Sequence, residues 1–406
     1  MHPLTLYSDS LCTIALTMSI IGILGGGHTA RMTTQTAQRL GALVAILDKD
    51  ENSPAAQVTA LAVEGDWTDL ELVSEFAQSC DVISPEGEDV PVEVLVMLEE
   101  QGRVVRPSSR TIASTRDRLI QKQTLQAAVL PVAAYADAPD VEAVRAFAAA
   151  HAFPLVLKTR TGGRDGRANV LVRHAGEIEP QFADLSVRGP LMIEEYQHFV
   201  RELVIVGVRG QDGVIRLYDV AETRCVQNIQ HASSAPAEDR YARYLVERGR
   251  AEGATYFAEI SALAEQVAKI IDVIGAFAIE LFEMRDGRIV INDVTPQPHF
   301  AGLWTIEGSL TSHVENHVRA LLGWPLGWTE MTVPHAAVAA LLARGDALPK
   351  ASDFVQAAQL RGAHIYWYGR TSSYFACRLG HVTGTAATDP EAERIAQSTV
   401  VALLGW

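Results

Sequence analysis

Two carboxylates on neighbouring apolar segments form the strongest local pattern in this sequence. Glu280 lies in the apolar run 277–282, and Asp293 ends a second apolar run, 289–293. If the two runs pair as an antiparallel hairpin, the carboxylates lie close together on one face. Buried carboxylates repel each other unless a cation lies between them, and Mg²⁺ prefers oxygen ligands and bridges them to nucleotide phosphates. The pattern predicts a magnesium site, although one solvent-facing acid and one turn acid would show the same spacing.

A second pattern places a lysine directly before a glycine-rich loop. Lys158 ends the apolar run 153–158, and the loop at about 159–170 contains Gly163 and Gly166. The chain has only five lysines among its 34 basic residues, so the positions of Lys158 and Lys122 are informative. Lysines beside such a loop neutralise nucleotide phosphates while the loop closes over them and excludes water. A pair of surface lysines is the alternative.

Three weaker patterns accompany these two. The glycines at 25–27 follow an apolar run, where they either let the backbone approach a phosphate or simply form a tight turn. Glu194 and Glu202 bracket the segment 196–201, an arrangement that can hold adenine by backbone groups and ribose by a carboxylate, or can be ordinary edge charge. His299 follows the second carboxylate closely enough to contact a substrate.

Composition excludes several classes of function. The chain has 406 residues, with 34 basic and 49 acidic side chains, and its formal net charge is −15. This balance argues against a general nucleic-acid binder and against a polybasic membrane anchor. No apolar run reaches the roughly 18 residues that a membrane span needs. The four cysteines are far apart and form no C-x-x-C pair, which predicts free thiols in a reducing, cytoplasmic setting.

The apolar periodicity predicts an α/β protein. Strand Ile20–Leu24, the glycine turn, a helix over 31–40 and a strand over 43–47 form a βαβ unit, which predicts a small parallel domain. The remaining expected helices cover 116–128, 141–152 and 258–274, and the expected strands cover 153–158, 169–172, 191–195, 202–208, 213–219, 277–282 and 289–293. Segments 336–343 and 364–368 predict a small C-terminal α+β domain. Residues 1–17 are expected to be an extension: either Met18, which starts a natural-looking enzyme N-terminus, is the true start, or the segment is a short disordered extension.

Six segments, in chain order, resemble motifs of the carboxyaminoimidazole ribonucleotide synthetase family of the ATP-grasp superfamily. Residues 25–32 (GGGHTARM) resemble G-G-G-Q-L-G-R-M, 53–58 resemble S-P-A-x-x-V, and 80–91 resemble C-D-V-I-T-Y-E-F-E-N-V-P. Asp117, Arg118 and Lys122 match D-R-x-x-x-K. Residues 157–167 resemble L-K-T-R-x-G-G-Y-D-G-K, and 292–307 resemble N-E-x-A-P-R-P-H-N-S-G-H-W-T-x-E. The resemblance spans residues 18 to about 385.

The resemblance implies an ATP-grasp fold with a parallel α/β pre-ATP-grasp domain at 18–110, an ATP-grasp domain at 111–330 and a C-terminal α+β domain at 331–406. It implies that ATP and Mg²⁺ are cofactors, and that Glu280 and Asp293 hold the Mg²⁺. The residues implied to bind ATP are Lys122, Lys158, Gly163, Gly166, Glu194 at the adenine hinge, Glu195, Glu202 at the ribose, and Asn292. The residues implied at the reacting groups are Arg164, Asp165, Gln297 and His299, and those at the ribonucleotide are Gly26, Gly27, His28, Glu86, Arg370 and Arg378.

In this family, the γ-phosphate of ATP passes to bicarbonate to give carboxyphosphate. The exocyclic amine of aminoimidazole ribonucleotide then captures the carboxyl group. The resemblance therefore implies an ATP-dependent ligase of purine biosynthesis, and it also implies a homodimer. No nucleic acid or membrane is expected as a partner.

The departures from the family pattern gather on the substrate side. Gln297 replaces an Arg, Arg164 replaces a Tyr, and residues 300–303 (FAGL) replace N-S-G-H. In the C-terminal domain, residues 376–381 (ACRLGH) replace G-R-K-x-G-H, which places Cys377 at an Arg position and Arg378 at a Lys position. The departures leave two alternatives open. One is a related ligase for a different amine, in which Phe300 and Leu303 line a more apolar pocket, and the other is a nucleotide-binding regulator without activity.

Overall fold

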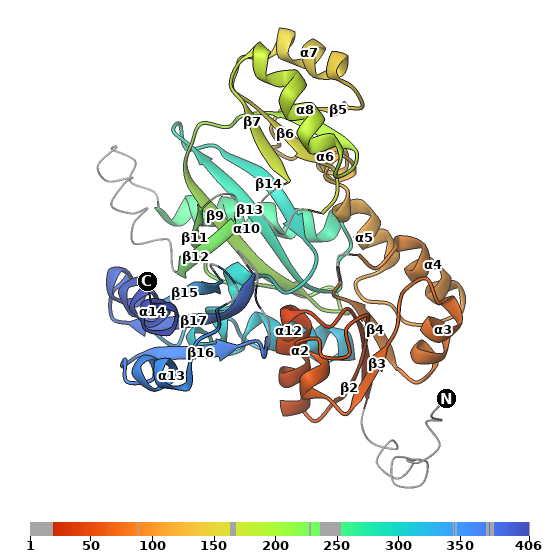
Figure 1. Cartoon of the computed structure of the whole chain (residues 1–406), viewed down its shortest axis with the longest axis vertical. Coiled ribbons are helices and arrows are strands. Elements are labelled where there is room, and N and C mark those ends of the chain that lie inside the picture. Colours follow the sequence, from red (N-terminus) through yellow and green to blue (C-terminus); the bar gives the residue numbers. More distant parts are fainter. Residues whose placement is uncertain are drawn as a thin grey trace.

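The computed structural model describes residues 19–87, 89–162, 168–226, 229–235, 253–343, 345, 347–370, 373 and 377–405. Three sheets organise these residues, and Figure 1 shows them as three regions of the molecule. Among the described helices, none combines the length and apolarity needed to cross a bilayer.

The first region is the predicted parallel α/β domain, and the structure confirms it. Its sheet has the order β3-β2-β1-β4, and all three strand pairings are parallel. The strands are β1 (Ile20–Leu24), β2 (Leu43–Asp48), β3 (Leu61–Glu64) and β4 (Val82–Pro85), and the helices are α2 (His28–Arg39), α3 (Leu70–Gln78) and α4 (Val92–Glu100). α2 lies beside α12 (His313–Leu322) of the neighbouring region, and Arg39 forms an ion pair with Glu315 across this contact.

The glycine turn after β1 is required by a close approach of two loops. Gly25 has a φ of +100°, and a side chain there would lie 2.5 Å from the backbone nitrogen of Gly87. The N–H groups of Glu86 and Gly87 both donate to the carbonyl of Leu24. Glycine at position 25 therefore lets the exits of β1 and β4 touch, which brings Glu86 beside the turn.

The second region is an antiparallel sheet of order β5-β8-β6-β7 with helices α7 (Val141–Ala150) and α8 (Ile178–Ser186) packed on it. Its strands are β5 (Tyr135–Ala138), β6 (Leu155–Thr159), β7 (Asn169–Val172) and β8 (Leu191–Glu195). The predicted strand–loop–strand unit around the glycine-rich loop is confirmed, because β6 and β7 pair antiparallel. Apolar side chains of both helices and of β6 and β8 form one buried cluster.

The third region is one large sheet of order β14-β13-β9-β11-β12-β15-β17-β16, with β10 paired to β9. Its first strands are β9 (Phe199–Arg209), β10 (Ile215–Leu217), β11 (Ala221–Val226), β12 (Ile229–Ala235), β13 (Gly275–Met284) and β14 (Ile289–Thr295). β15 (His335–Leu342), β16 (Ala363–Trp367) and β17 (Arg378–Ala386) continue it. Helices α10 (Gly253–Ile270), α11 (Thr305–Gly308), α12, α13 (Ala351–Ala357) and α14 (Asp389–Leu404) complete the region. The C-terminal segment thus extends the sheet that β9–β14 begin, since β12 and β15 pair directly.

Several predicted elements have different bounds in the structure. The helix expected over 116–128 is α6 (Arg118–Ala127), which begins two residues later because the Asp117 side chain accepts the N–H groups of Leu119 and Ile120 and starts the helix. The preceding helix α5 (Ser109–Arg116) was not predicted. The helix expected to reach 274 ends at Ile270, and Asp272 nearby has a φ of +51°. The strand expected over 213–219 has only three residues.

Acid is expected to destabilise the C-terminal part of the sheet through His381. This side chain is fully buried, and its Nδ1 lies 2.7 Å from the hydroxyl of Tyr368. Burial, and then the charge of Arg378, lower the pKa of His381 to about 3. Since the unfolded ring has a pKa near 6.5, the unfolded chain binds the extra proton between about pH 6.5 and 3, so stability falls as the pH falls through this window.

Thermal unfolding between pH 7.5 and 4.5 would measure this loss. We expect the wild type to lose roughly 2 kcal/mol more stability over that interval than His381→Gln, which cannot take up the proton. His174→Gln is the control, because His174 is exposed and its replacement should leave the acid sensitivity unchanged. Equal acid sensitivity of the wild type and His381→Gln would contradict the assignment.

Candidate active site

A buried carboxylate joins the two predicted phosphate-binding lysines. Glu194 is the penultimate residue of β8 and is 3% exposed, and its Oε2 lies 2.7 Å from Nζ of Lys158 near the end of β6. Its Oε1 lies 3.4 Å from Nζ of Lys122, which projects from α6 and is 2% exposed. Lys122 also donates to the carbonyl of Ile291 at 3.0 Å. The two lysines are therefore buried together and share one counter-ion, which excludes the surface alternative.

The charges of this cluster compensate one another. Burial would raise the pKa of Glu194, but the ammonium groups of Lys158 and Lys122 outweigh burial and hold it below its usual value. Burial lowers the pKa of Lys122, and the charge of Glu194 opposes that decrease. Two buried ammonium groups with a single carboxylate leave one positive charge in excess, which suits the binding of a phosphate.

The predicted carboxylate pair forms as the sequence indicates. Glu280 on β13 and Asp293 on β14 are register partners in an antiparallel ladder. A β-bulge interrupts the ladder beside Glu280, so that Asn292 has no register partner of its own. The Asn292 side chain therefore reaches the same face as Glu280, donates to its Oε2 at 3.3 Å, and accepts from Nζ of Lys158 at 3.2 Å.

The electrostatics of the pair favour a cation. Burial, and then the charges of Asp293 and Glu202, raise the pKa of Glu280 to about 7. Among the described residues there is no group of three or more His, Cys, Asp or Glu side chains that could bind a metal by itself. Two carboxylates with an amide suit a Mg²⁺ ion that takes its other ligands from water and from phosphates.

Arg118, which belongs to a family motif but was not predicted as a site residue, supports the glycine-rich loop. Its guanidinium donates to the carbonyls of Thr159 and Gly162, each at 2.8 Å, and so holds the backbone where the glycine-rich loop leaves β6. Its charge also lowers the pKa of Glu280. The signal was present in the sequence, because Arg118 and Lys122 are four residues apart and share a face of α6.

His299 lies beside the carboxylate pair. Its Nε2 is 3.6 Å from Oε1 of Glu280, and its Nδ1 accepts the N–H of Ala301 at 3.3 Å. A continuous set of contacts therefore runs through Lys122, Glu194, Lys158, Asn292, Glu280 and His299. Glu202 is half-buried on β9, Glu195 is exposed at the end of β8, and Gln297 is half-buried between β14 and His299. The predicted residues Gly163, Arg164, Asp165 and Gly166 lie outside the described part of the chain.

The residues predicted at the ribonucleotide lie where the first and third regions meet. The N–H of Gly26 donates to the carboxylate of Asp48, so it is already paired, whereas Gly27 is exposed at the start of α2. The ring of His28 stacks on Tyr368 with centroids 5.1 Å apart. This contact brings the start of α2 beside Tyr368, which lies two residues before Arg370 in the sequence.

Glu86 is buried in the protein and does not lie at its surface. It is 4% exposed, and its Oε1 lies 3.8 Å from Nε2 of His317. Nδ1 of His317 accepts the N–H of Ala276 at 3.0 Å, so in the neutral ring the proton is on Nε2, facing Glu86. The structure thus places Glu86 against α12, beneath the glycine turn.

The expectation that Phe300 and Leu303 line an open apolar pocket is wrong. Phe300 is 5% exposed and Leu303 is 4% exposed, and both belong to a core cluster with Trp304. The ring of Phe300 lies under the guanidinium of Arg378, 4.1 Å from its central carbon. These apolar replacements therefore extend the core, because their rings and methyl groups pack against the large sheet.

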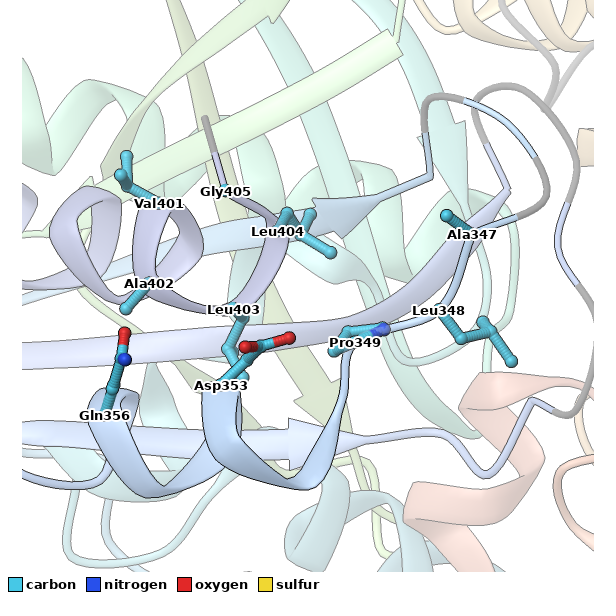
Figure 2. A pocket seen from close by; sticks show the side chains of 10 residues that line it. All are labelled: Ala347, Leu348, Pro349, Asp353, Gln356, Val401, Ala402, Leu403, Leu404 and Gly405. Carbon is cyan, nitrogen blue, oxygen red and sulfur yellow. The ribbon is translucent and has the colours of Figure 1, made fainter.

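A cavity of about 430 Å³ lies elsewhere, on the C-terminal part of the molecule between the start of α13 and the end of α14. Figure 2 shows that side chains of α14 and of the segment before α13, such as Leu404 and Leu348, surround it. None of the predicted site residues that the structure describes lines this cavity. It is therefore separate from the charged site.

Comparisons with known proteins agree with this geometry. Residues 18–116 match the ribonucleotide synthetase preATP-grasp domain, and residues 123–314 match the ATP-grasp domain. The chain is 31% identical over 379 residues to the N5-carboxyaminoimidazole ribonucleotide synthase of Synechococcus elongatus, covering 93% of this chain and 92% of that one. It is 32% identical over 374 residues to the enzyme of Mycobacterium tuberculosis, covering 89% and 82% of the two chains.

Solved structures give the same result. The N5-carboxyaminoimidazole ribonucleotide synthetase of Thermus thermophilus superposes with a TM-score of 0.82 at 29% identity, covering 95% of this chain and 99% of that one. The enzyme of Aspergillus clavatus, in complex with ADP and 5-aminoimidazole ribonucleotide, superposes with a TM-score of 0.84 at 26% identity, covering 95% and 98%. With both domains matched and the charged site in place, the chain belongs to the N5-carboxyaminoimidazole ribonucleotide synthase family of ATP-grasp ligases.

Proposed function

We propose that this protein carboxylates aminoimidazole ribonucleotide with bicarbonate at the expense of ATP, forming carboxyaminoimidazole ribonucleotide, ADP and phosphate. The observation that carries the proposal is the continuous set of contacts in which the buried Lys122 and Lys158 share the carboxylate of Glu194 and connect through Asn292 to Glu280. This site offers positive charge for phosphates on one side and a pair of carboxylates for a cation on the other.

In the first step, a bicarbonate oxygen forms a bond to the γ-phosphorus of ATP, and the bond from that phosphorus to the β–γ bridging oxygen breaks, releasing ADP. Lys158 and Lys122 bind the phosphate oxygens and offset their charge, which is the main contribution a protein makes to phosphoryl transfer. Glu280 and Asp293, with Asn292 beside them, would hold Mg²⁺. When bound, Mg²⁺ neutralises charge on the phosphates.

In the second step, the exocyclic amine of the ribonucleotide attacks the carboxyl carbon of carboxyphosphate. The carbon–oxygen bond to phosphate breaks, phosphate leaves, and the amine loses a proton. His299 lies next to the carboxylate pair and is positioned to contact the reacting carboxyl group. Arg370 and Arg378 supply cations for the phosphate of the ribonucleotide, and Gly27 and His28 contact the ribonucleotide from the opposite side.

The competing ligase hypothesis loses part of its support, because Phe300 and Leu303, which it placed in a more apolar pocket, are buried in the core. The regulator hypothesis rests on Gln297, whereas the lysines and both carboxylates are retained together. By resemblance to the family, we further propose that the protein works as a homodimer in the cytoplasm.

Release of ADP by the purified protein, with ATP, Mg²⁺ and bicarbonate, tests the proposal. We expect aminoimidazole ribonucleotide to stimulate ADP release at least about tenfold and a carboxylated ribonucleotide to form, because the amine consumes the activated intermediate. A control without bicarbonate should remove the carboxylated product. Turnover of ATP that is indifferent to saturating ribonucleotide would overturn the choice of substrate, and absence of any turnover would favour the regulator.

A further inference from the structure

One contact joins a core side chain of the ATP-grasp region to a cation of the C-terminal strands. Phe300, in the short helix that follows His299, is 5% exposed, and the guanidinium carbon of half-buried Arg378 lies 4.1 Å from the centre of its ring. At this separation the positive charge is attracted by the negative face of the ring. The two side chains come from segments that are 78 residues apart in the sequence.

The two residues are also complementary departures from the family pattern. Phe300 is at a position where the family motif has Asn, and Arg378 is at a position where it has Lys. A planar guanidinium can stack on a ring and still present N–H donors in its plane, whereas a Lys ammonium is a compact, strongly hydrated charge. A Phe at position 300 therefore suits an Arg at position 378 better than it suits a Lys.

β17 contains no second Lys or Arg that could bind the phosphate of the ribonucleotide. Arg378 is the sole Lys or Arg of β17, and Cys377, at the position of the family's second cation, is 2% exposed and carries no positive charge. The phosphate is therefore left with Arg370 and this single cation of β17, so the orientation of Arg378 matters more here than in a site to which the strand contributes two cations. Its neighbours Tyr368 and His381 are both fully buried. Burial raises the pKa of Tyr368, and the charge of Arg378 opposes that increase, whereas burial and then the charge of Arg378 both lower the pKa of His381.

Phe300 also connects Arg378 to the part of the site that contains His299 and the carboxylate pair. It directly follows His299, whose Nε2 lies 3.6 Å from Glu280, and Ser233 donates to the carbonyl of Ala301 at 3.2 Å and fixes the segment from below. Moving the ring would shift Arg378 relative to the carboxylate pair. This arrangement therefore fixes the distance between Arg378, at the phosphate end of the substrate, and the carboxylate pair, at its amine end.

We propose that Phe300 is a positioning residue whose ring holds the guanidinium of Arg378 in the orientation that receives the phosphate of the ribonucleotide. The proposal rests on the proposed function, since it presumes a ribonucleotide whose phosphate contacts Arg378.

Steady-state kinetics of Phe300→Leu, Arg378→Lys and the double variant test this coupling, with aminoimidazole ribonucleotide and ATP varied separately. For Phe300→Leu, which keeps an apolar side chain but removes the ring, we expect the KM for the ribonucleotide to rise about three- to thirtyfold and the KM for ATP to stay within twofold. Arg378→Lys keeps the charge and should give a similar rise. The double variant should be no worse than the poorer single variant, because both changes break one contact.

Matched controls separate positioning from packing. Phe76→Leu removes another ring that is 5% exposed, in α3 of the first region, and it should lower the melting temperature without changing either KM. Phe300→Tyr keeps the ring and should retain a ribonucleotide KM within threefold of the wild type. If Phe300→Leu does not fold, Arg378→Lys and Phe300→Tyr still decide the question.

The outcomes distinguish a failure of the proposed function from a failure of the role proposed for Phe300. If Arg378→Ala leaves the ribonucleotide KM unchanged, the phosphate role assigned to Arg378 under the proposed function fails. If Arg378→Ala raises that KM but Phe300→Leu or Arg378→Lys does not, the role of the ring fails and the proposed function stands. Multiplicative effects in the double variant would also overturn the proposal, because they would mean that Phe300 acts independently of Arg378.

Discussion

Replacement of Glu280 by Gln is expected to lower ADP release by at least about 100-fold while leaving the protein as stable as the wild type, or more stable. The activity should fall because a neutral amide cannot share a cation with Asp293 and the ATP phosphates, and loss of one such charged contact costs about two orders of magnitude or more in rate. The stability should not fall, because the raised pKa of Glu280 reports that its charge is unfavourable in the folded protein without a cation.

The test separates a role in binding the cation from a structural role, because the activity should fall while the stability should not. ADP release over a range of Mg²⁺ concentrations measures the first effect, and thermal unfolding at pH 8 without Mg²⁺ measures the second. Asp286→Asn is the control on the same hairpin, since Asp286 is exposed at the turn, where it forms an ion pair with exposed Arg288, and its replacement should change neither quantity appreciably. A variant that loses stability and activity together would indicate a structural role for Glu280.

The carboxylate hairpin was predictable because its signal is local. Two apolar runs around a turn specify antiparallel strands, and the alternation of side chains then places Glu280 and Asp293 on one face. The bulge that adds Asn292 to this face was not predictable in the same way, because a single extra residue in a ladder leaves no periodic trace in so short a strand. The family resemblance, which included Asn292, supplied what the periodicity lacked.

The role of Glu194 depends on contacts between distant segments, and local pattern could not reveal them. Its side chain lies between lysines that are 36 and 72 residues away in the sequence, and their charges explain why a carboxylate can be buried there. The resemblance placed Glu194 at an adenine hinge, which remains a prediction. The structure adds that its side chain is the shared counter-ion of the lysine pair and offsets one of the two positive charges.

Long-range packing also decided the substrate side of the molecule. The sequence of residues 300–303 indicates only that polar groups are replaced by apolar ones, which fits an apolar pocket as well as a larger core. The pairing of β12 with β15 settles the matter, because it folds the C-terminal strands over this segment and buries it with Trp304. Pairing between strands about 100 residues apart follows from the assembled sheet and cannot be read from either strand alone.

Replacement of Glu194 by Gln is expected to lower the free energy of unfolding by about 3–5 kcal/mol in the absence of nucleotide. The change leaves the ammonium groups of Lys122 and Lys158 buried without their shared counter-ion, and removal of one partner from a buried ion pair typically costs this much. Denaturant unfolding measures the loss. Glu195→Gln is the control, because this neighbouring carboxylate is exposed and its replacement should change stability by less than about 0.5 kcal/mol.

A second substitution tests whether charge is the cause. Lys122→Met in the Glu194→Gln background removes one of the two uncompensated ammonium groups and should restore part of the lost stability, although it removes a phosphate ligand and therefore should not restore ADP release. ATP should also stabilise Glu194→Gln more than it stabilises the wild type, because its phosphates replace the missing anion. The opposite result would be a double variant that is less stable than Glu194→Gln, by as much as the loss of a buried side chain normally lowers the free energy of unfolding. That result would mean that packing rather than charge stabilises this cluster.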